Sequence, residues 1–254
     1  MANPVKVKAT VTHVQPFGKS TYQVQFEPHG VIPKFKAGQF LHLAIDEYDP
    51  MGGFWPESRV FSIASALGSQ KIEILYSVKG NYTARMQQEL YVGRAVWLKL
   101  PYGSFIIDNL IHDDQDVVLV AGGTGISPFL PYLQLKVASI DSSDSFTFNR
   151  VLLYYGVREN NLLVALDTIK AWSDMPFSSA RIFIEYEDLI HENTCNLSFE
   201  KGGLDIGQIF EDGWYRSRLF GKPAASRQAC AVRQRDEEVL HHSHGKRKLG
   251  DRKS

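Results

Sequence analysis

The sequence contains few cysteines: its 254 residues include two, Cys195 and Cys230. Two thiolates cannot supply the four ligands of an iron–sulfur cluster, and they do not make a disulfide framework. Such sparing use of cysteine is typical of a reducing compartment, so we expect the protein in the cytoplasm.

Long apolar runs are also missing. The opening residues MANPVKVKAT contain no apolar segment of the kind found in signal peptides. No apolar run approaches the roughly 20 residues needed to cross a bilayer. We therefore expect neither a signal peptide nor a membrane span.

The sequence has no net charge, because Lys plus Arg and Asp plus Glu both number 28. This balance gives no reason to expect binding to nucleic acid or to a membrane surface. The charge is unevenly spread, since residues 216–254 hold eleven Lys or Arg and four Asp or Glu, a net charge of +7. That segment lacks periodic apolar residues, so we predict an atypical, disordered basic tail. Its histidines at 241, 242 and 244 have no ordered support, and no metal site is expected.

Residues 1–108 are rich in β-strand patterns. Alternating runs such as VKVKATVTHV, TYQVQF and QFLHLAI recur at roughly even spacing, and turn sequences such as PFGK, EPHG and DPMGG separate them. This arrangement is typical of an antiparallel barrel or sandwich. One helix is predicted around YTARMQQEL, after the turn KGN.

Residues 114–215 have a different pattern of apolar residues. The apolar run DVVLVAGG is typical of a parallel strand buried on both faces. Two helix patterns, PFLPYLQLKVAS and NNLLVALDTIKAWS, alternate with two further strand patterns, RVLLYYG and ARIFIEY. Alternating strands and helices predict a parallel α/β sheet. The expected fold class is therefore all-β plus α/β.

The segment AGGTGISPF carries the strongest motif. Gly123, Gly125 and Pro128 have the spacing G-x-G-x-x-P between a predicted strand and a predicted helix. Glycine lets a backbone approach a phosphate closely, and a helix N-terminus offers free N–H groups and a positive dipole end. The alternative is a plain strand-to-helix turn, but this context favours phosphate binding. Since the third position is proline, the motif is not the ordinary dinucleotide fingerprint.

The segment ESRVFSIAS places polar residues in a strand pattern. Val60 and Ser62 fall on one face of such a strand, and Phe61 falls on the other. Arg59 and Ser62 are either solvated residues of an edge strand or ligands of something anionic and flat. Taken by themselves, they are more common as solvated residues.

Several motifs occur here in the order seen in flavoprotein reductases of the ferredoxin–NADP reductase type. They are AGQF, RVFSIAS, GNYT, PYGSF, AGGTGISPF and YYGVREN, spread over roughly residues 5–170. The chain resembles that family. The resemblance implies a six-stranded antiparallel FAD-binding β-barrel over residues 1–108 and a parallel α/β NAD(P)-binding domain over residues 114–215. It also implies an NAD(P)H-dependent oxidoreductase that passes hydride to FAD and electrons to a separate acceptor, such as a redox protein.

The resemblance implies roles for particular residues. Arg59 pairs with the FAD pyrophosphate, and the hydroxyl of Ser62 acts catalytically near the reactive nitrogen of the flavin. Phe61 stands where the family usually has tyrosine, so it packs on the cofactor without that hydroxyl. The residues implied to bind FAD are Arg59, Val60, Phe61, Ser62, Tyr76, Val78, Gly80, Tyr82 and Thr83. Those implied to bind the nicotinamide nucleotide are Gly122, Gly123, Thr124, Gly125, Ser127, Pro128, Gly156 and Arg158.

Some alternatives stay open. No cluster of arginine and lysine marks a 2′-phosphate pocket, so the sequence does not decide between NADH and NADPH. The resemblance stops near residue 215: no Cys-Gly pair follows WYRS, and Cys230 precedes an alanine. Divergence, truncation or a shifted reading frame would each explain this departure, so the sequence leaves open whether the α/β domain is incomplete. The alternative functions are a flavin-binding module or degraded reductase without efficient NAD(P)H turnover, and an unstable product without activity.

Overall fold

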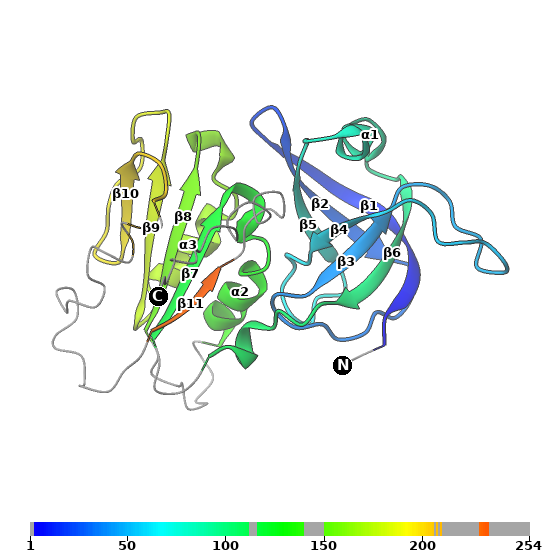
Figure 1. The fold of residues 1–254 in the computed structure, drawn as a ribbon, viewed down its shortest axis with the longest axis horizontal. Helices are drawn as coiled ribbons and strands as arrows, with labels where there is room; N and C mark the ends of the chain where they lie inside the picture. The colour runs from blue at the N-terminus through cyan, green and yellow to red at the C-terminus, as the bar shows by residue number, and fades with distance from the viewer. Residues whose placement is uncertain are drawn as a thin grey trace, which may run out of the picture.

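The computed structural model describes residues 3–111, 116–139, 150–205, 207, 209 and 229–233. The strands in these ranges form two sheets, which lie side by side in Figure 1. The first sheet is antiparallel and the second is parallel. The fold class predicted from the two sequence patterns, all-β plus α/β, is therefore confirmed. Among the described helices, none is both long and apolar enough to cross a membrane.

The antiparallel sheet has the strand order β4-β3-β6-β1-β2-β5. Alternate side chains of its first strand, Val7, Ala9 and Val11, point into an apolar core. The two outer strands approach each other where the Ala64 N–H donates to the Glu73 carbonyl at 2.8 Å, so the sheet curls into a nearly closed barrel. Its strands are β1 (Val5–Phe17), β2 (Thr21–Pro28), β3 (Phe40–Ala44), β4 (Arg59–Ser62), β5 (Ile72–Ser77) and β6 (Ala95–Tyr102).

One α-helix, α1 (Asn81–Glu89), lies against the barrel (Figure 1). It packs Tyr82 and Met86 into the barrel core. This helix is the one predicted from YTARMQQEL, and that prediction is confirmed.

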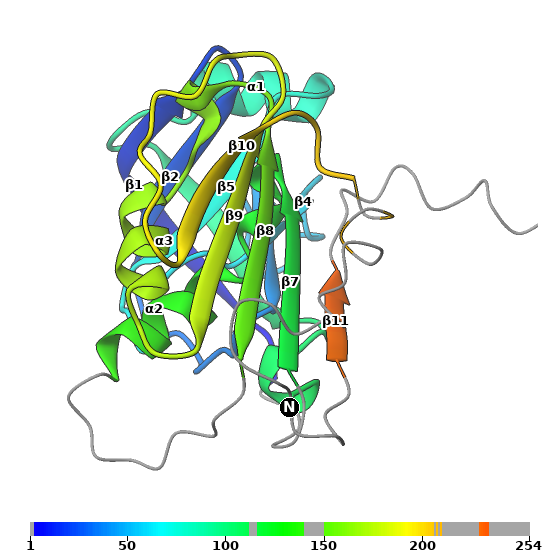
Figure 2. The ribbon, with the colours of Figure 1, turned by 90° about the vertical axis from the view of Figure 1, so that its left-hand side faces the viewer.

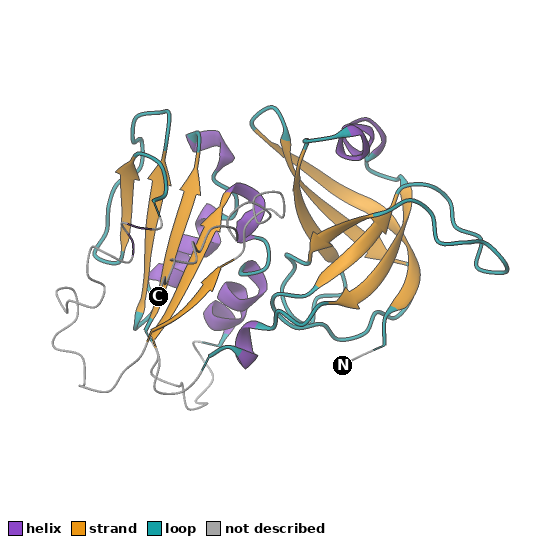
Figure 3. Ribbon diagram, viewed as in Figure 1, coloured by secondary structure: helices purple, strands orange, loops and turns teal. Residues whose placement is uncertain are grey.

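The parallel sheet, called the open sheet below, has the strand order β10-β9-β8-β7-β11. Helices α2 (Leu130–Ala138) and α3 (Leu166–Ser173) cover the face turned toward the barrel, where Leu133 and Trp172 pack on the strands (Figures 1 and 3). Its strands are β7 (Asp116–Gly122), β8 (Val151–Val157), β9 (Ser178–Ile184), β10 (Leu197–Lys201) and β11 (Ala229–Arg233). Short 3-10 turns occur at η1 (Ile107–Asn109), η2 (Gly123–Ile126) and η3 (Asn160–Leu162).

Strand β11 lies within the predicted basic tail. Its five residues pair in parallel with β7, with Cys230 opposite Val117 (Figure 2). The structure thus differs from the predicted disorder for these residues, because pairing with a strand far away in the sequence orders a segment that has little apolar periodicity of its own. The remainder of residues 216–254, including the three histidines, lies outside the described residues.

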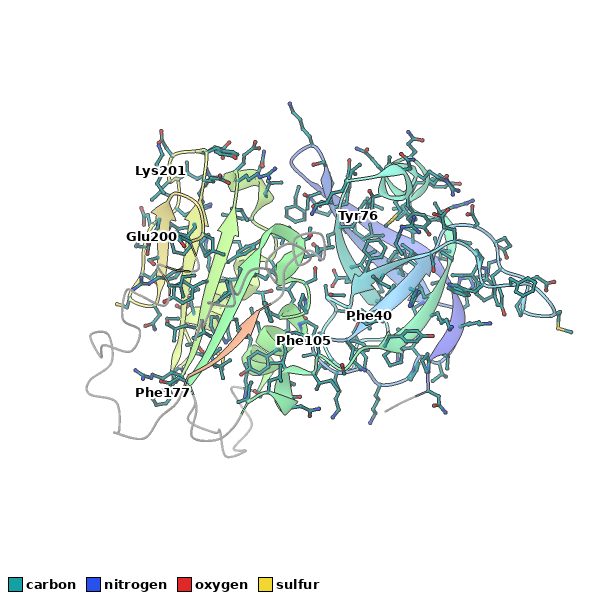
Figure 4. All side chains as sticks on the ribbon, in the orientation of Figure 1. Phe40, Tyr76, Phe105, Phe177, Glu200 and Lys201 are labelled. Atoms are coloured by element: carbon teal, nitrogen blue, oxygen red, sulfur yellow. The ribbon has the colours of Figure 1, made fainter. Side chains whose placement is uncertain are left out.

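The barrel and the open sheet share an apolar boundary. At Gly38, where φ is +97°, a Cβ atom would lie 2.2 Å from the Phe105 carbonyl oxygen, so only glycine fits. The Phe105 ring lies 6.4 Å from the Phe129 ring, just before α2, and Figure 4 shows Phe105 between the two sheets. Ala64 and Leu75 of the barrel belong to the same apolar cluster as the core of the open sheet. Segments on either side of this boundary are therefore held in a fixed arrangement.

Candidate functional site

Arg59 opens strand β4 and is held by three contacts. Its guanidinium lies over the Tyr82 ring at 4.8 Å from the centroid. Its Nη2 donates to a Glu57 carboxylate oxygen at 2.8 Å, and its Nη1 donates to the Ser58 carbonyl at 3.0 Å. The side chain is still 49% exposed. Since a guanidinium has five N–H donors, Arg59 can keep these contacts and also bind an anion from solvent.

Tyr82, a predicted ligand-binding residue, supports Arg59 from the barrel side. Its hydroxyl donates to the Leu43 carbonyl at 2.8 Å and accepts from the Ile45 N–H at 3.2 Å. Burial raises the pKa of this phenol to about 12, so it remains a neutral hydrogen-bonding group. The structure therefore directs the Tyr82 hydroxyl into the barrel and places its ring under Arg59.

The start of α1 offers a second group for an anion. Gly80 caps the helix, and a Cβ atom placed on it would meet no atom within 4 Å. The Thr83 hydroxyl accepts from the N–H groups of Lys79 and Gly80, at 2.9 and 3.1 Å. The first turn contains no acidic side chain, so the positive end of the helix dipole is not offset locally. Backbone N–H groups at this exposed helix start suit a phosphate.

The rest of β4 and the end of β5 form an aromatic surface. The Phe61 ring lies 6.2 Å from the ring of Tyr76, which is buried and stacks on Tyr22 at 5.3 Å. Val60 and Ser62 lie on the other face of β4, opposite His42 and Phe40 of β3. Both are at least partly exposed, whereas Val78, after β5, packs on the barrel core. Phe61 and Ser62 are thus both partly accessible from solvent, on opposite faces of β4, whereas Tyr76 is buried.

The glycine motif forms the turn η2 at the end of β7. Gly122 and Gly123 are exposed, and a Cβ atom on either would meet no atom within 4 Å. Gly123 has φ +52°, a conformation that favours glycine. Gly125 is buried, and the buried hydroxyl of Ser127 donates to the Thr124 carbonyl at 2.6 Å. The open part of this turn is therefore its first half.

Helix α2 begins later than the sequence suggests. Pro128 is buried in the turn between η2 and α2, and the helix proper starts at Leu130. The helical hydrogen bonds nevertheless run on from the glycine turn, since Phe129 N–H donates to the Ile126 carbonyl at 2.9 Å and Leu130 N–H to the Ser127 carbonyl at 3.3 Å. The first N–H groups of such a turn lack partners within it and are available to an anion.

The glycine turn lies where the strand order of the open sheet reverses. From β7 the chain moves outward through β8, β9 and β10, and β11 then pairs with the opposite side of β7. In open α/β sheets, ligands bind at the carboxyl ends of the strands at such a reversal. Topology thus supports the predicted phosphate site independently of the motif.

The two remaining predicted residues lie on the neighbouring strand, β8. Gly156 is opposite Gly122, and a Cβ atom on it would lie 2.8 Å from the Cβ of Leu204. Close packing of Leu204 therefore explains this glycine. Arg158 follows the end of β8 and is exposed.

The barrel and the glycine turn are in contact at their boundary, through residues that neighbour the predicted ones. Leu75, next to Tyr76, packs in the same apolar cluster as Ile126 of η2. The hairpin between β1 and β2 also lies against η3, the turn after β8, because a Cβ atom on Gly18 would lie 3.0 Å from Leu162 Cδ2. Sequence reasoning identified PFGK as a turn but had no signal for its partner across the boundary.

Sequence comparisons find relatives whose names include a ferredoxin–NADP reductase and an electron transfer component. No protein-family model matches the chain. It is similar to component C of methane monooxygenase from Methylosinus trichosporium, at 30% identity over 133 residues, which cover 51% of this chain and 37% of that protein. It is also similar to a ferredoxin–NADP reductase from Pseudomonas aeruginosa, at 28% identity over 219 residues, which cover 78% of each protein. The chain spans about a third of the length of the first two curated relatives that it matches.

A solved structure has the same fold. The ferredoxin–NADP⁺ reductase from Neisseria gonorrhoeae, with bound FAD and NADP, superposes with a TM-score of 0.62 at 20% identity. The superposition covers 89% of this chain and 84% of that one. The fold predicted from the motifs is confirmed, and so is the resemblance on which it rested.

Proposed function

Since the chain has the fold and the relatives of ferredoxin–NADP reductase-type flavoproteins, we propose that it is an FAD-dependent oxidoreductase. It takes hydride from NAD(P)H and passes electrons to a separate acceptor. The observation that carries this proposal is the position of the glycine turn: it lies at the strand reversal of the open sheet and packs beside the barrel strand that leads to α1. Two sites suited to phosphates thus lie on either side of one boundary.

The barrel residues fit FAD. Arg59 and the N-terminus of α1 would hold its pyrophosphate, because a half-exposed guanidinium and free helical N–H groups are both good phosphate donors. Phe61 would pack on the flavin ring, and Ser62 would place a hydroxyl close to it. Bound FAD would supply the redox chemistry, since a flavin accepts a hydride and releases electrons singly or in pairs. The protein's part is to hold and orient it.

The glycine turn would hold the nucleotide. Gly122 and Gly123 leave open space at the backbone, where a pyrophosphate can approach the first N–H groups of η2. The nicotinamide would then lie between the glycine turn and the flavin that Phe61 and Ser62 would hold. In this proposal residues 1–108 form the FAD-binding domain, and residues 114–215 together with β11 form the nucleotide-binding domain.

The electron acceptor is proposed to be a separate redox protein. With two cysteines, the chain has no four-thiolate site for an iron–sulfur cluster of its own. Component C of methane monooxygenase, among the relatives, is by its name one part of a larger system.

The deciding experiment is reduction of the bound flavin. The protein is purified, loaded with FAD and dialysed, and its flavin absorbance is followed without oxygen after NADH or NADPH is added. We expect retained yellow colour and bleaching by at least one nucleotide. Protein that dithionite bleaches but neither nucleotide does would overturn the proposal and leave a flavin-binding module.

A further inference from the structure

At the carboxyl edge of the open sheet, where β7, β8 and β9 end, the segments that follow β8 and β9 are held together by hydrogen bonds. Gly122 of β7 is opposite Gly156 of β8, and β8 ends one residue later. The segments that follow β8 and β9 remain paired, because Tyr186 N–H donates to the Arg158 carbonyl at 2.9 Å. Side chains after β9 are therefore fixed close to the end of β8.

The Glu187 side chain, which follows β9, forms hydrogen bonds to the segment that follows β8. Its Oε2 accepts from the backbone N–H of Asn160 at 2.6 Å and from Asn160 Nδ2 at 2.9 Å. Asn160 begins η3, two residues after Arg158. A carboxylate that follows β9 in the sequence thus lies at the end of β8, the strand beside the glycine turn. Among the described residues, no donor bonds its second oxygen, Oε1.

The positive charges at this edge do not outnumber the negative ones. Arg158 is exposed and lies between the glycine turn and Glu187 in the order of the strands. Glu159 follows it directly, so two carboxylates, those of Glu159 and Glu187, and one guanidinium belong to the segments at the end of β8. The nearby Lys201 is paired with Asp188. Within the described ranges, the edge therefore has a net negative charge.

We infer that this edge makes the nucleotide site selective for NADH over NADPH, with Glu187 as the specificity-determining residue. The inference rests on the proposed function, which places a nicotinamide nucleotide on the glycine turn. In doubly wound sheets an acidic side chain at the end of the second strand accepts a hydrogen bond from the adenosine ribose 2′-hydroxyl. The same carboxylate repels a 2′-phosphate, which carries close to two negative charges near neutral pH.

Binding of the oxidised nucleotides tests this without turnover. Calorimetry on the FAD-loaded protein should give a Kd for NAD⁺ at least about tenfold lower than that for NADP⁺. Glu187→Gln keeps an oxygen for Asn160 and removes the charge, so this ratio should fall several-fold, mainly through tighter binding of NADP⁺. Glu192→Gln is the matched control, because Glu192 is an exposed carboxylate on the same segment and should leave the ratio unchanged.

The possible results separate this inference from the proposed function. Equal or tighter binding of NADP⁺ by the wild-type protein overturns the inference, and so does an unchanged ratio in Glu187→Gln or the absence of binding by both nucleotides. Selective binding of NAD⁺ that responds to Glu187→Gln supports it even if NADH fails to bleach the flavin. In that case the proposed hydride transfer fails and the nucleotide selectivity stands.

Discussion

Arg59 balances two demands on one side chain. Its ion pair with Glu57 and its contact with the Tyr82 ring fix its position, while half of the side chain stays exposed to solvent. An exposed ion pair contributes little to the stability of the fold. The exposed N–H donors of Arg59 therefore remain available for a ligand. Sequence alone gave its residue type, but the supporting ring could only be identified from the folded structure.

We predict that Arg59→Ala weakens FAD retention at least tenfold. Loss of a charge-assisted contact to a phosphate costs on the order of 1.5 to 3 kcal/mol. Titration of the FAD-free protein with FAD, followed by flavin fluorescence, measures the change. Arg181→Ala is the control, because Arg181 also makes an exposed ion pair, with Glu200, but lies on the open sheet. Equal FAD affinity in Arg59→Ala and the wild type would show that Arg59 is an ordinary surface residue.

Glu73, on β5, provides a prediction on pH. Burial raises the pKa of its carboxyl, although Gln23 Nε2 donates to it at 2.5 Å and acts in the opposite direction. A raised folded-state pKa means that the folded protein holds this proton more tightly than the unfolded chain. The contribution to stability is therefore complete below the unfolded pKa of about 4.3 and is lost as the pH rises through the folded value.

Glu73→Gln, which stays neutral, should therefore unfold at a higher temperature than the wild type near neutral pH. The difference should shrink below about pH 4, where Glu73 is protonated in both states. Thermal unfolding monitored by circular dichroism across this pH range measures it. Glu27→Gln, at an exposed position of β2, should show no such trend. A Glu73→Gln difference that is the same at every pH would contradict this explanation.

At the scale of elements, β7, η2 and α2 form a strand-turn-helix unit whose glycines have different roles. Gly125 is buried, so a larger side chain there would disturb the packing of the turn. Gly122 is exposed, has φ −125°, and leaves open space around a Cβ atom. A side chain at Gly122 is therefore compatible with the fold and tests only whether something must approach the backbone.

Gly122→Val should keep the flavin and lose nucleotide binding. Valine suits an extended backbone, so the stability should change little, while the branched side chain fills the space where a pyrophosphate approaches. We expect at least a tenfold rise in the nucleotide Kd, on the order of 1.4 kcal/mol or more. Gly52→Val, at another open glycine without a positive φ, is the control. A nucleotide Kd in Gly122→Val equal to that of the wild type would show that the turn is only a connection.

The same scale shows which elements a sequence can predict. The long apolar runs of β7 and β8 and the helix α1 were predicted because their patterns are continuous and local. Strands β10 and β11 were not predicted, since each has only five residues. Both are stabilised by parallel pairing with strands distant in the sequence, which local patterns do not encode. The glycine motif was also predicted, because its pattern is local and chemically distinctive.

At the scale of the whole molecule, the boundary between barrel and open sheet decides whether the two proposed ligand sites face each other. The sequence predicted both parts but not their contact, which depends on how Gly38, Phe105 and Phe129 pack. Glu187 is a related case, because its carboxylate reaches the end of β8 only through its hydrogen bonds to Asn160. Contacts of this kind form between elements and cannot be read from either element alone.

Gly38→Ala tests the importance of this boundary. The new Cβ atom would lie 2.2 Å from the Phe105 carbonyl oxygen, a backbone atom of the segment that leads from β6 toward the open sheet, so this segment would have to shift. Gly68→Ala is the matched control, because Gly68 also has a positive φ, +80°, but open space around its Cβ position. Gly68→Ala should lower the free energy of unfolding by about 1 to 2 kcal/mol, the strain of a positive φ in alanine. Gly38→Ala should cost more than about 3 kcal/mol, since it adds a clash in the core to the same strain. Urea unfolding followed by tryptophan fluorescence measures both, and equal losses in the two variants would mean that the boundary yields easily and does not fix the two sites.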